Sequence, residues 1–152
     1  MTTKRILYTR VDGGVDVLAP TASELARLMF NDMTESQAID LIKAKDVPSG
    51  AANVEVVEAA TLPTDKSFRN AWVRPGFGPP AVDMPKARII QQGRIEAARK
   101  DKMRDLLLRE ALGENVTALK AQVNAVNAAA LVAGAANEAA LKAVIPSVLA
   151  AP

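Results

Sequence analysis

The segment that most restricts how this chain can fold lies near its middle, at residues 74–85, "RPGFGPPAVDMP". Four of its twelve residues are proline and two are glycine. Proline has no backbone N–H and its ring clashes with the preceding helical turn, so such a segment cannot continue a helix or a central strand. We therefore interpret 74–85 as a Pro/Gly-rich linker between a small N-terminal domain, residues 1–73, and a helical C-terminal half.

The N-terminal domain has the pattern of a small α+β unit. Residues 4–20 predict a β-hairpin, because Asp12, Gly13 and Gly14 separate two apolar runs and glycine accepts the backbone angles of a tight turn. Two capped helices should follow, the first beginning after Thr21 with Glu24, the second after Thr34 with Gln37. We expect the second helix to bury Ala38, Ile39, Leu41 and Ile42. The alternating residues 53–60 predict a third strand, half-buried.

A long charged helix is predicted over residues 86–112. Asp83 can cap its start, Pro85 suits the first turn, and Gly113 is a natural end. Its middle, "RKDKMRD", offers only Met103 as an apolar side chain. A helix without a continuous apolar stripe is usually exposed along that stretch, so we expect an arm and not a core helix.

The Ala-rich region 113–152 carries an apolar repeat with alternating steps of four and three residues. This spacing is typical of a coiled coil, and region 113–152 has only four charged residues. We interpret it as an oligomerisation or partner-binding region, although folding back as an antiparallel helical hairpin would cover the same side chains. The predicted oligomerisation residues are Leu112, Val116, Leu119, Val123, Val126 and Ala130. The chain is then an α+β protein with a long helix and Ala-rich C-terminal helices.

Composition argues against most catalytic chemistry. The chain has no histidine and no cysteine, which removes the commonest general base, the commonest transition-metal ligand and any disulfide. No serine lies in a nucleophile motif, and the glycines of 74–85 lack the Lys-Ser/Thr of a phosphate loop. We expect a non-enzymatic protein without cofactor or metal. With neither a signal-peptide pattern nor an apolar run near ~18 residues, we also expect no membrane association.

The basic part of the long helix, residues 86–105, has two interpretations. It could contact phosphates, or it could be a solvated face, because acidic residues lie between the cations and no aromatic residue is available to stack on bases. We favour the solvated face, so nucleic acid is an unlikely partner. The cations concerned are Arg88, Arg94, Arg99, Lys100, Lys102 and Arg104.

The rare aromatic residues gather in "TDKSFRNAW", residues 64–72. We predict a short helical turn capped by Thr64 or Asp65, in which Phe68 and Trp72 share one face and Arg69 can pair with Asp65. A lone tryptophan in a small domain is more often a core residue, but Trp and Arg are also enriched at interface hot spots. The candidate partner-binding residues are Phe68, Arg69, Trp72 and Arg74.

Three of these motifs together resemble those of a known group of proteins. "YTRVDGGVDVLAP", "DKSFRNAW" and "VDMPKAR" are similar to sequences of small structural proteins encoded in the tail and fibre regions of tailed bacteriophages and prophages. The resemblance implies a virion component made in the bacterial host cytoplasm, with other phage virion proteins (tail, neck or fibre) as partners. Homo-oligomers are expected separately, from the heptad spacing and low charge of region 113–152. The resemblance implies no catalytic residues. The alternatives are a tail or fibre assembly chaperone absent from the mature virion, and a nucleic-acid-associated protein acting through residues 86–105.

Overall fold

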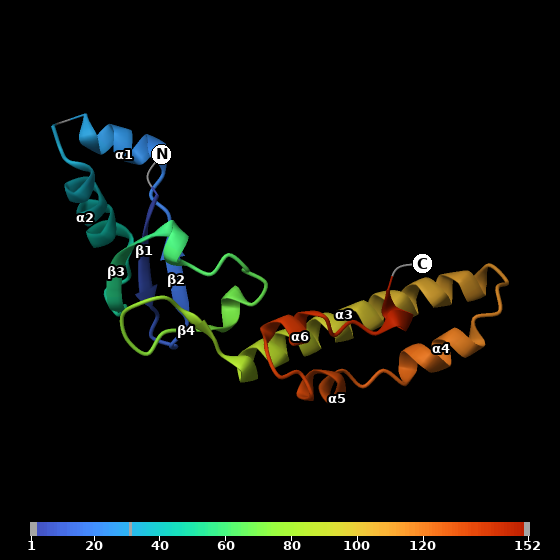
Figure 1. Ribbon diagram of the computed structural model, residues 1–152. Helices are drawn as coiled ribbons and strands as arrows, with labels where there is room; N and C mark the ends of the chain where they lie inside the picture. The colour runs from blue at the N-terminus through green and yellow to red at the C-terminus, as the bar shows by residue number, and fades with distance from the viewer. Residues whose placement is uncertain (1–2, 31, 151–152) are drawn as a thin grey trace. The chain divides into compact units, whose positions relative to one another are not determined.

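The computed structural model describes residues 3–30 and 32–150, which form two compact units divided between Val82 and Asp83 (Figure 1). The first unit contains all the strands of the described chain and two α-helices, and the second is helical. The predicted α+β class, with a small sheet-containing domain followed by a long helix and shorter helices, is confirmed.

The first unit is built on a three-stranded antiparallel sheet in the order β2-β1-β3. The predicted hairpin is present as β1 (Lys4–Thr9) and β2 (Val15–Leu18), with Leu7 opposite Val17. Its turn closes through Arg10 N donating to Gly14 O at 2.7 Å, and Gly13 has a φ of +79°, the left-handed conformation that favours glycine. The third strand, β3 (Ala52–Glu58), pairs with the other edge of β1.

Two helices cover one face of this sheet, α1 (Ala22–Met29) and α2 (Glu35–Asp46). Both predicted N-caps are confirmed: Thr21 accepts from the Glu24 amide, and Thr34 and Gln37 form a complete capping box. The core on this face joins one strand residue to the helices and consists of Ile6, Leu25, Ala38, Ile39 and Ile42. Leu41 was wrongly predicted to be buried and is 47% exposed, because it lies about 100° around the helix from Ile42.

The opposite face of the sheet is covered by the segment that contains the tryptophan. Here Leu7, Val15 and Trp72 form a second core. The covering segment includes two 3₁₀ turns, η1 (Ala59–Thr61) and η2 (Arg69–Ala71), and the short strands β4 (Trp72–Val73) and β5 (Ala81–Val82). Because both faces are covered, the central strand is buried at every position from Ile6 to Thr9 and does not alternate.

The Pro/Gly-rich segment is not a linker between domains as we predicted. β4 and β5 pair antiparallel, with Trp72 opposite Val82, so residues 74–80 are the loop that joins two paired strands of the first unit. Pro75, Pro79 and Pro80 all lie in this loop, where no ladder hydrogen bond needs their missing N–H. The second unit begins directly after β5.

The second unit is organised by α3 (Met84–Ala111), which begins two residues before the predicted start. Asp83 caps it by accepting from the Lys86 amide, and Gly113, with a φ of +90°, follows its end, both as expected. The helix is not the exposed arm that we predicted. It buries Ala87, Gln91, Ile95 and Leu106 against α4 (Thr117–Asn124), α5 (Ala128–Ala133), α6 (Glu138–Lys142) and η3 (Ser147–Leu149).

The predicted heptad seam is replaced by a repeat of nine residues. The continuous helix that a coiled coil requires is broken after α4 and again after α5, and the chain folds back on α3. The buried side chain near the end of each short helix recurs every nine residues, at Val123, Val132 and Leu141. Three residues further on, Val126, Ala135 and Val144 each donate a backbone N–H to the carbonyl of that buried residue. One helix and its turn therefore form the repeating unit.

Polar side chains of α3 bind the backbone carbonyl that follows each of these helix ends. Arg99 Nη1 donates to Val126 O at 3.3 Å, Arg88 Nη2 to Ala135 O at 2.9 Å, and Gln91 Nε2 to Val144 O at 3.0 Å. In each case the carbonyl lies two residues after the last helical residue. These carbonyls belong to the turns that follow the short helices, so α3 supplies one donor to each turn.

Gln91 provides a test of this arrangement. It is 4% exposed, and its Oε1 also accepts from Arg94 at 3.2 Å. We expect Gln91→Leu to lower the free energy of unfolding by about 1–3 kcal/mol, because the Val144 carbonyl loses its donor. Gln92→Leu is the matched control, because the side chain of Gln92 donates to the exposed Glu96 and not to a buried carbonyl. This substitution should change the free energy of unfolding by no more than ~0.5 kcal/mol. Urea unfolding followed by circular dichroism measures both, and equal losses would contradict the assigned role.

Candidate functional site

The short helical turn that we predicted in "TDKSFRNAW" is present, but it is a 3₁₀ turn and begins at Arg69, later than a cap at Thr64 or Asp65 implies. Asp65 Oδ1 accepts from the Ser67 amide at 2.8 Å, and the chain then enters the 3₁₀ turn η2. Phe68 and Trp72 are 0% and 1% exposed. Both rings therefore lie inside the first unit, and Trp72 belongs to its core with Leu7 and Val15. This placement favours the core interpretation of the two aromatic residues over the docking one.

Arg74 is also internal, contrary to its predicted place among residues available to a partner. It is 3% exposed, its Nη1 lies 3.3 Å from Glu55 Oε2, and its Nη2 donates to Asn53 O. Gly78 N donates to the same Glu55 oxygen at 3.1 Å. Burial lowers the pKa of Arg74, and the charge of Glu55 opposes that shift. Arg74 thus fastens the 74–80 loop to β3.

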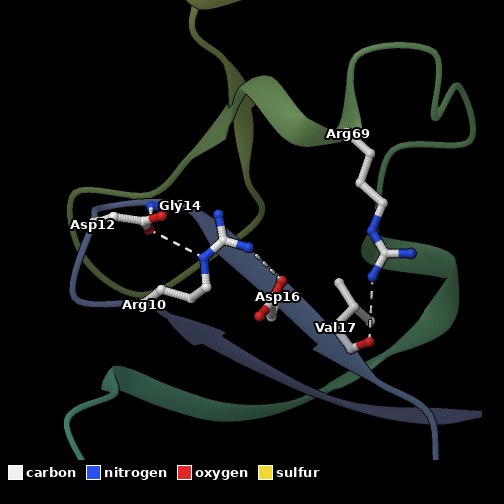
Figure 2. A network of polar contacts seen from close by, with 6 residues as sticks. All are labelled: Arg10, Asp12, Gly14, Asp16, Val17 and Arg69. Atoms are coloured by element: carbon white, nitrogen blue, oxygen red, sulfur yellow. Dashed lines mark hydrogen bonds and ion pairs between the residues drawn. The ribbon is translucent and has the colours of Figure 1, made fainter.

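Arg69 is the one exposed member of the predicted partner-binding set. Figure 2 shows its side chain extending from η2 toward β2, where Nη2 lies 3.4 Å from Val17 O. Val17 stands on the outer edge of the sheet, since β2 is paired only with β1. Exposed carbonyls on an edge strand can pair with a strand of another chain. The Arg69 side chain covers the Val17 carbonyl.

Arg69 also borders a hollow of about 400 Å³ in the surface of the first unit. Arg5 and Lys66 line the same hollow, so three cations surround it, and none of the described residues that line it is acidic. Its apolar lining comes largely from Val17, Leu62, Pro63 and Trp72. The sequence indicated Arg69 and Trp72. Arg5 was missed because it lies about 60 residues from Lys66 and Arg69 and only the fold brings it to them. Lys66 lies three residues before Arg69 and no local pattern distinguished it from the other exposed cations.

Trp72 has a second property that bears on this hollow. Its indole Nε1 is buried and has no hydrogen-bond partner within the described part of the chain. A buried donor without an acceptor costs about 1–3 kcal/mol, so most such groups in folded proteins are satisfied. The hollow therefore combines three positive charges with an aromatic residue whose donor is unused.

The acidic residues of the hairpin are engaged within the hairpin itself (Figure 2). Arg10 Nε lies 3.1 Å from Asp12 Oδ1, Arg10 Nη1 lies 3.2 Å from Asp16 Oδ1, and Asp12 Oδ1 also accepts from Gly14 N at 2.9 Å. Burial and the nearby negative charge of Asp16 raise the pKa of Tyr8. This network rigidifies the turn and neutralises its carboxylates locally.

In the second unit, the predicted oligomerisation residues do not form one surface. Val116 and Val123 are buried within the unit and Val126 is half-buried, whereas Leu112, Leu119 and Ala130 are exposed. Three exposed leucines lie instead at the end of α3, where Leu107, Leu108 and Leu112 are 50%, 62% and 75% exposed. Leu108 and Leu112 are four residues apart and share one helix face.

The cations of α3 are likewise divided among different partners. Arg88 and Arg99 donate to backbone carbonyls, Arg94 donates to Gln91, and Arg104 pairs with Asp101 at 3.2 Å. Within the described part of the chain, Lys100 and Lys102 are the two of these six cations that have no contact of this kind. The helix therefore presents these residues neither as one phosphate-binding stripe nor as the single solvated face that we predicted, because Arg88 and Arg99 are half-buried against the short helices.

No family model, curated protein or solved structure matches the chain. Across residues 3–30 and 32–150, no three His, Cys, Asp or Glu side chains are grouped so that they could hold a metal ion. Within the same residues, none of the helices combines the length and the apolar character needed to cross a bilayer.

Substitution of Trp72 tests its place in the core. We expect Trp72→Ala to lower the free energy of unfolding by about 3–5 kcal/mol, as large-to-small changes at buried aromatic residues do, and Trp72→Phe to lower it by less. Phe30→Ala is the control, because Phe30 is 87% exposed, and its effect should stay within ~0.5 kcal/mol. Thermal unfolding followed by far-UV circular dichroism gives all three values. Unchanged stability in Trp72→Ala would restore the docking interpretation.

Proposed function

We propose that this protein is a non-enzymatic structural component of a tailed-phage virion, attached at the tail, neck or fibre base through contacts with other virion proteins. The resemblance of its hairpin, "DKSFRNAW" and "VDMPKAR" motifs to small tail- and fibre-region proteins supplies the context. The exposed leucines of the second unit supply the physical reason to expect protein partners.

The observation that carries the proposal is the apolar surface at the end of α3. Leu107, Leu108 and Leu112 lie there, and Leu119 of α4 is also partly exposed at 36%. The nearby charges are already paired, with Arg109 Nη2 2.8 Å from Glu114 Oε2 and Lys120 Nζ 2.8 Å from Glu110 Oε2. Exposed apolar groups rimmed by polar residues mark protein–protein interaction sites.

Mass spectrometry of purified particles tests the location. We expect peptides of this protein in virions at a constant ratio to a major tail protein, and their persistence after the particles are washed in high salt, since apolar contacts are not screened by ions. A major capsid protein and a non-structural phage protein serve as positive and negative controls. Presence in infected lysates with absence from virions would identify an assembly chaperone instead and would refute the virion role.

Self-association is a separate expectation for the same leucines. We expect sedimentation velocity to show oligomers at tens of micromolar protein, and Leu112→Lys to weaken association by at least about tenfold, because burying one leucine is worth about 1.5–3 kcal/mol. Leu41→Lys is a control in the first unit, where Leu41 is also an exposed leucine, and should leave association unchanged. A monomer at every concentration would exclude homo-oligomers and leave only other virion proteins as partners.

A further inference from the structure

We propose that the hollow lined by Arg5, Lys66, Arg69 and Trp72 binds an acidic peptide segment of a partner protein, with a glutamate or aspartate side chain between the cations and a neighbouring apolar side chain against the floor. The inference rests on the proposed function in one respect only, namely that another virion protein supplies the segment. Its chemistry follows from the lining of the hollow alone.

The charge of the lining requires an anion. Arg69 donates to Val17 O at 3.4 Å, so its guanidinium is held beside the hollow. A guanidinium has five donors in a planar fork that matches a carboxylate, and Arg5, whose Nη1 donates to Lys4 O at 2.7 Å, adds its positive charge to the same hollow. Lys66, which is exposed, adds a third positive charge on the same hollow.

The apolar part of the lining distinguishes a peptide from a small inorganic anion. Val17, Leu62 and Pro63 form apolar walls of the hollow. A bare phosphate or sulfate has no apolar group that could pack against these walls. A volume of about 400 Å³ is also much larger than one such ion needs. Trp72 also belongs to this lining and adds to its apolar part.

The overall charge of the first unit argues against nucleic acid as the ligand. Residues 1–82 contain nine Lys and Arg against ten Asp and Glu. Nucleic-acid binding surfaces are broadly positive and contact many phosphates, whereas here three cations stand on a unit that carries no net positive charge. A local cluster of this kind suits one or two carboxylates.

Trp72 makes binding directly measurable, because it is the chain's single tryptophan and it lines the hollow. The full-length protein is titrated with a peptide of alternating glutamate and leucine while tryptophan fluorescence is recorded. We expect a saturable change in emission and an affinity that falls as salt is raised, since salt screens exposed charges. A peptide of alternating glutamine and leucine and a single-stranded DNA oligonucleotide are titrated in parallel and should bind at least about tenfold more weakly.

Two charge-reversal variants locate the site. Lys66→Glu should weaken binding of the glutamate peptide by at least about tenfold, because an attraction becomes a repulsion inside the hollow. Arg27→Glu makes the same change of charge on α1 at an exposed residue that does not line the hollow, and should change affinity less than twofold. Circular dichroism verifies that both variants are folded.

The proposal is overturned if the glutamate peptide fails to bind at millimolar concentration, if the two variants weaken binding equally, or if the glutamine peptide or the DNA binds as well as the glutamate peptide. These outcomes are independent of particle composition. If the protein binds the acidic peptide but is absent from virions, the proposed function is refuted and the peptide site stands. If the protein is present in virions but binds no acidic peptide, the peptide site is refuted and the proposed function stands.

Discussion

The second unit depends on the hydrogen bonds that α3 gives to the ends of the short helices beside it. Helices of five to eight residues, such as α4, α5 and α6, are too short to be stable alone in water, and each leaves carbonyls without partners where it ends. Arg88, Gln91 and Arg99 bind the carbonyl that follows each end. Together with the small apolar contacts of this Ala-rich segment, these donors let a chain poor in large side chains form a packed unit. They also explain why several cations of α3 face inward.

The first unit follows a different principle, in which a central strand is buried on both faces. The helices α1 and α2 cover Ile6, and the segment that contains Trp72 covers Leu7. A domain of this size has little apolar surface to bury, and Trp72, its largest side chain, lies in one of these two cores. Arg74 and Glu55 then fix the proline-rich loop to β3. The consequence for function is that Phe68, Trp72 and Arg74 stabilise the fold, while Arg69 stays exposed beside a hollow.

The surfaces left available for partners are therefore chemically distinct. The end of α3 presents leucines, which suit a neighbour with an apolar patch of its own. The hollow of the first unit presents cations over an apolar floor, which suits a segment that joins a carboxylate to an apolar side chain. A virion protein that contacts more than one neighbour requires such separate surfaces, since each contact is then formed by its own chemistry.

The sequence by itself determined the local elements of this protein. The Asp12-Gly13-Gly14 turn, the caps at Thr21, Thr34 and Asp83 and the end at Gly113 were all predicted correctly, because each depends on residues a few positions apart. Tertiary structure decided what required distant partners. The heptad spacing of 112–133 gave way to a nine-residue repeat because α3 offers donors that no local pattern reveals, and segment 74–85 became a loop because Trp72 pairs with Val82. The hollow also depends on tertiary structure, because only the pairing of β1 with its neighbours and the packing of Trp72 bring Arg5 to Lys66 and Arg69.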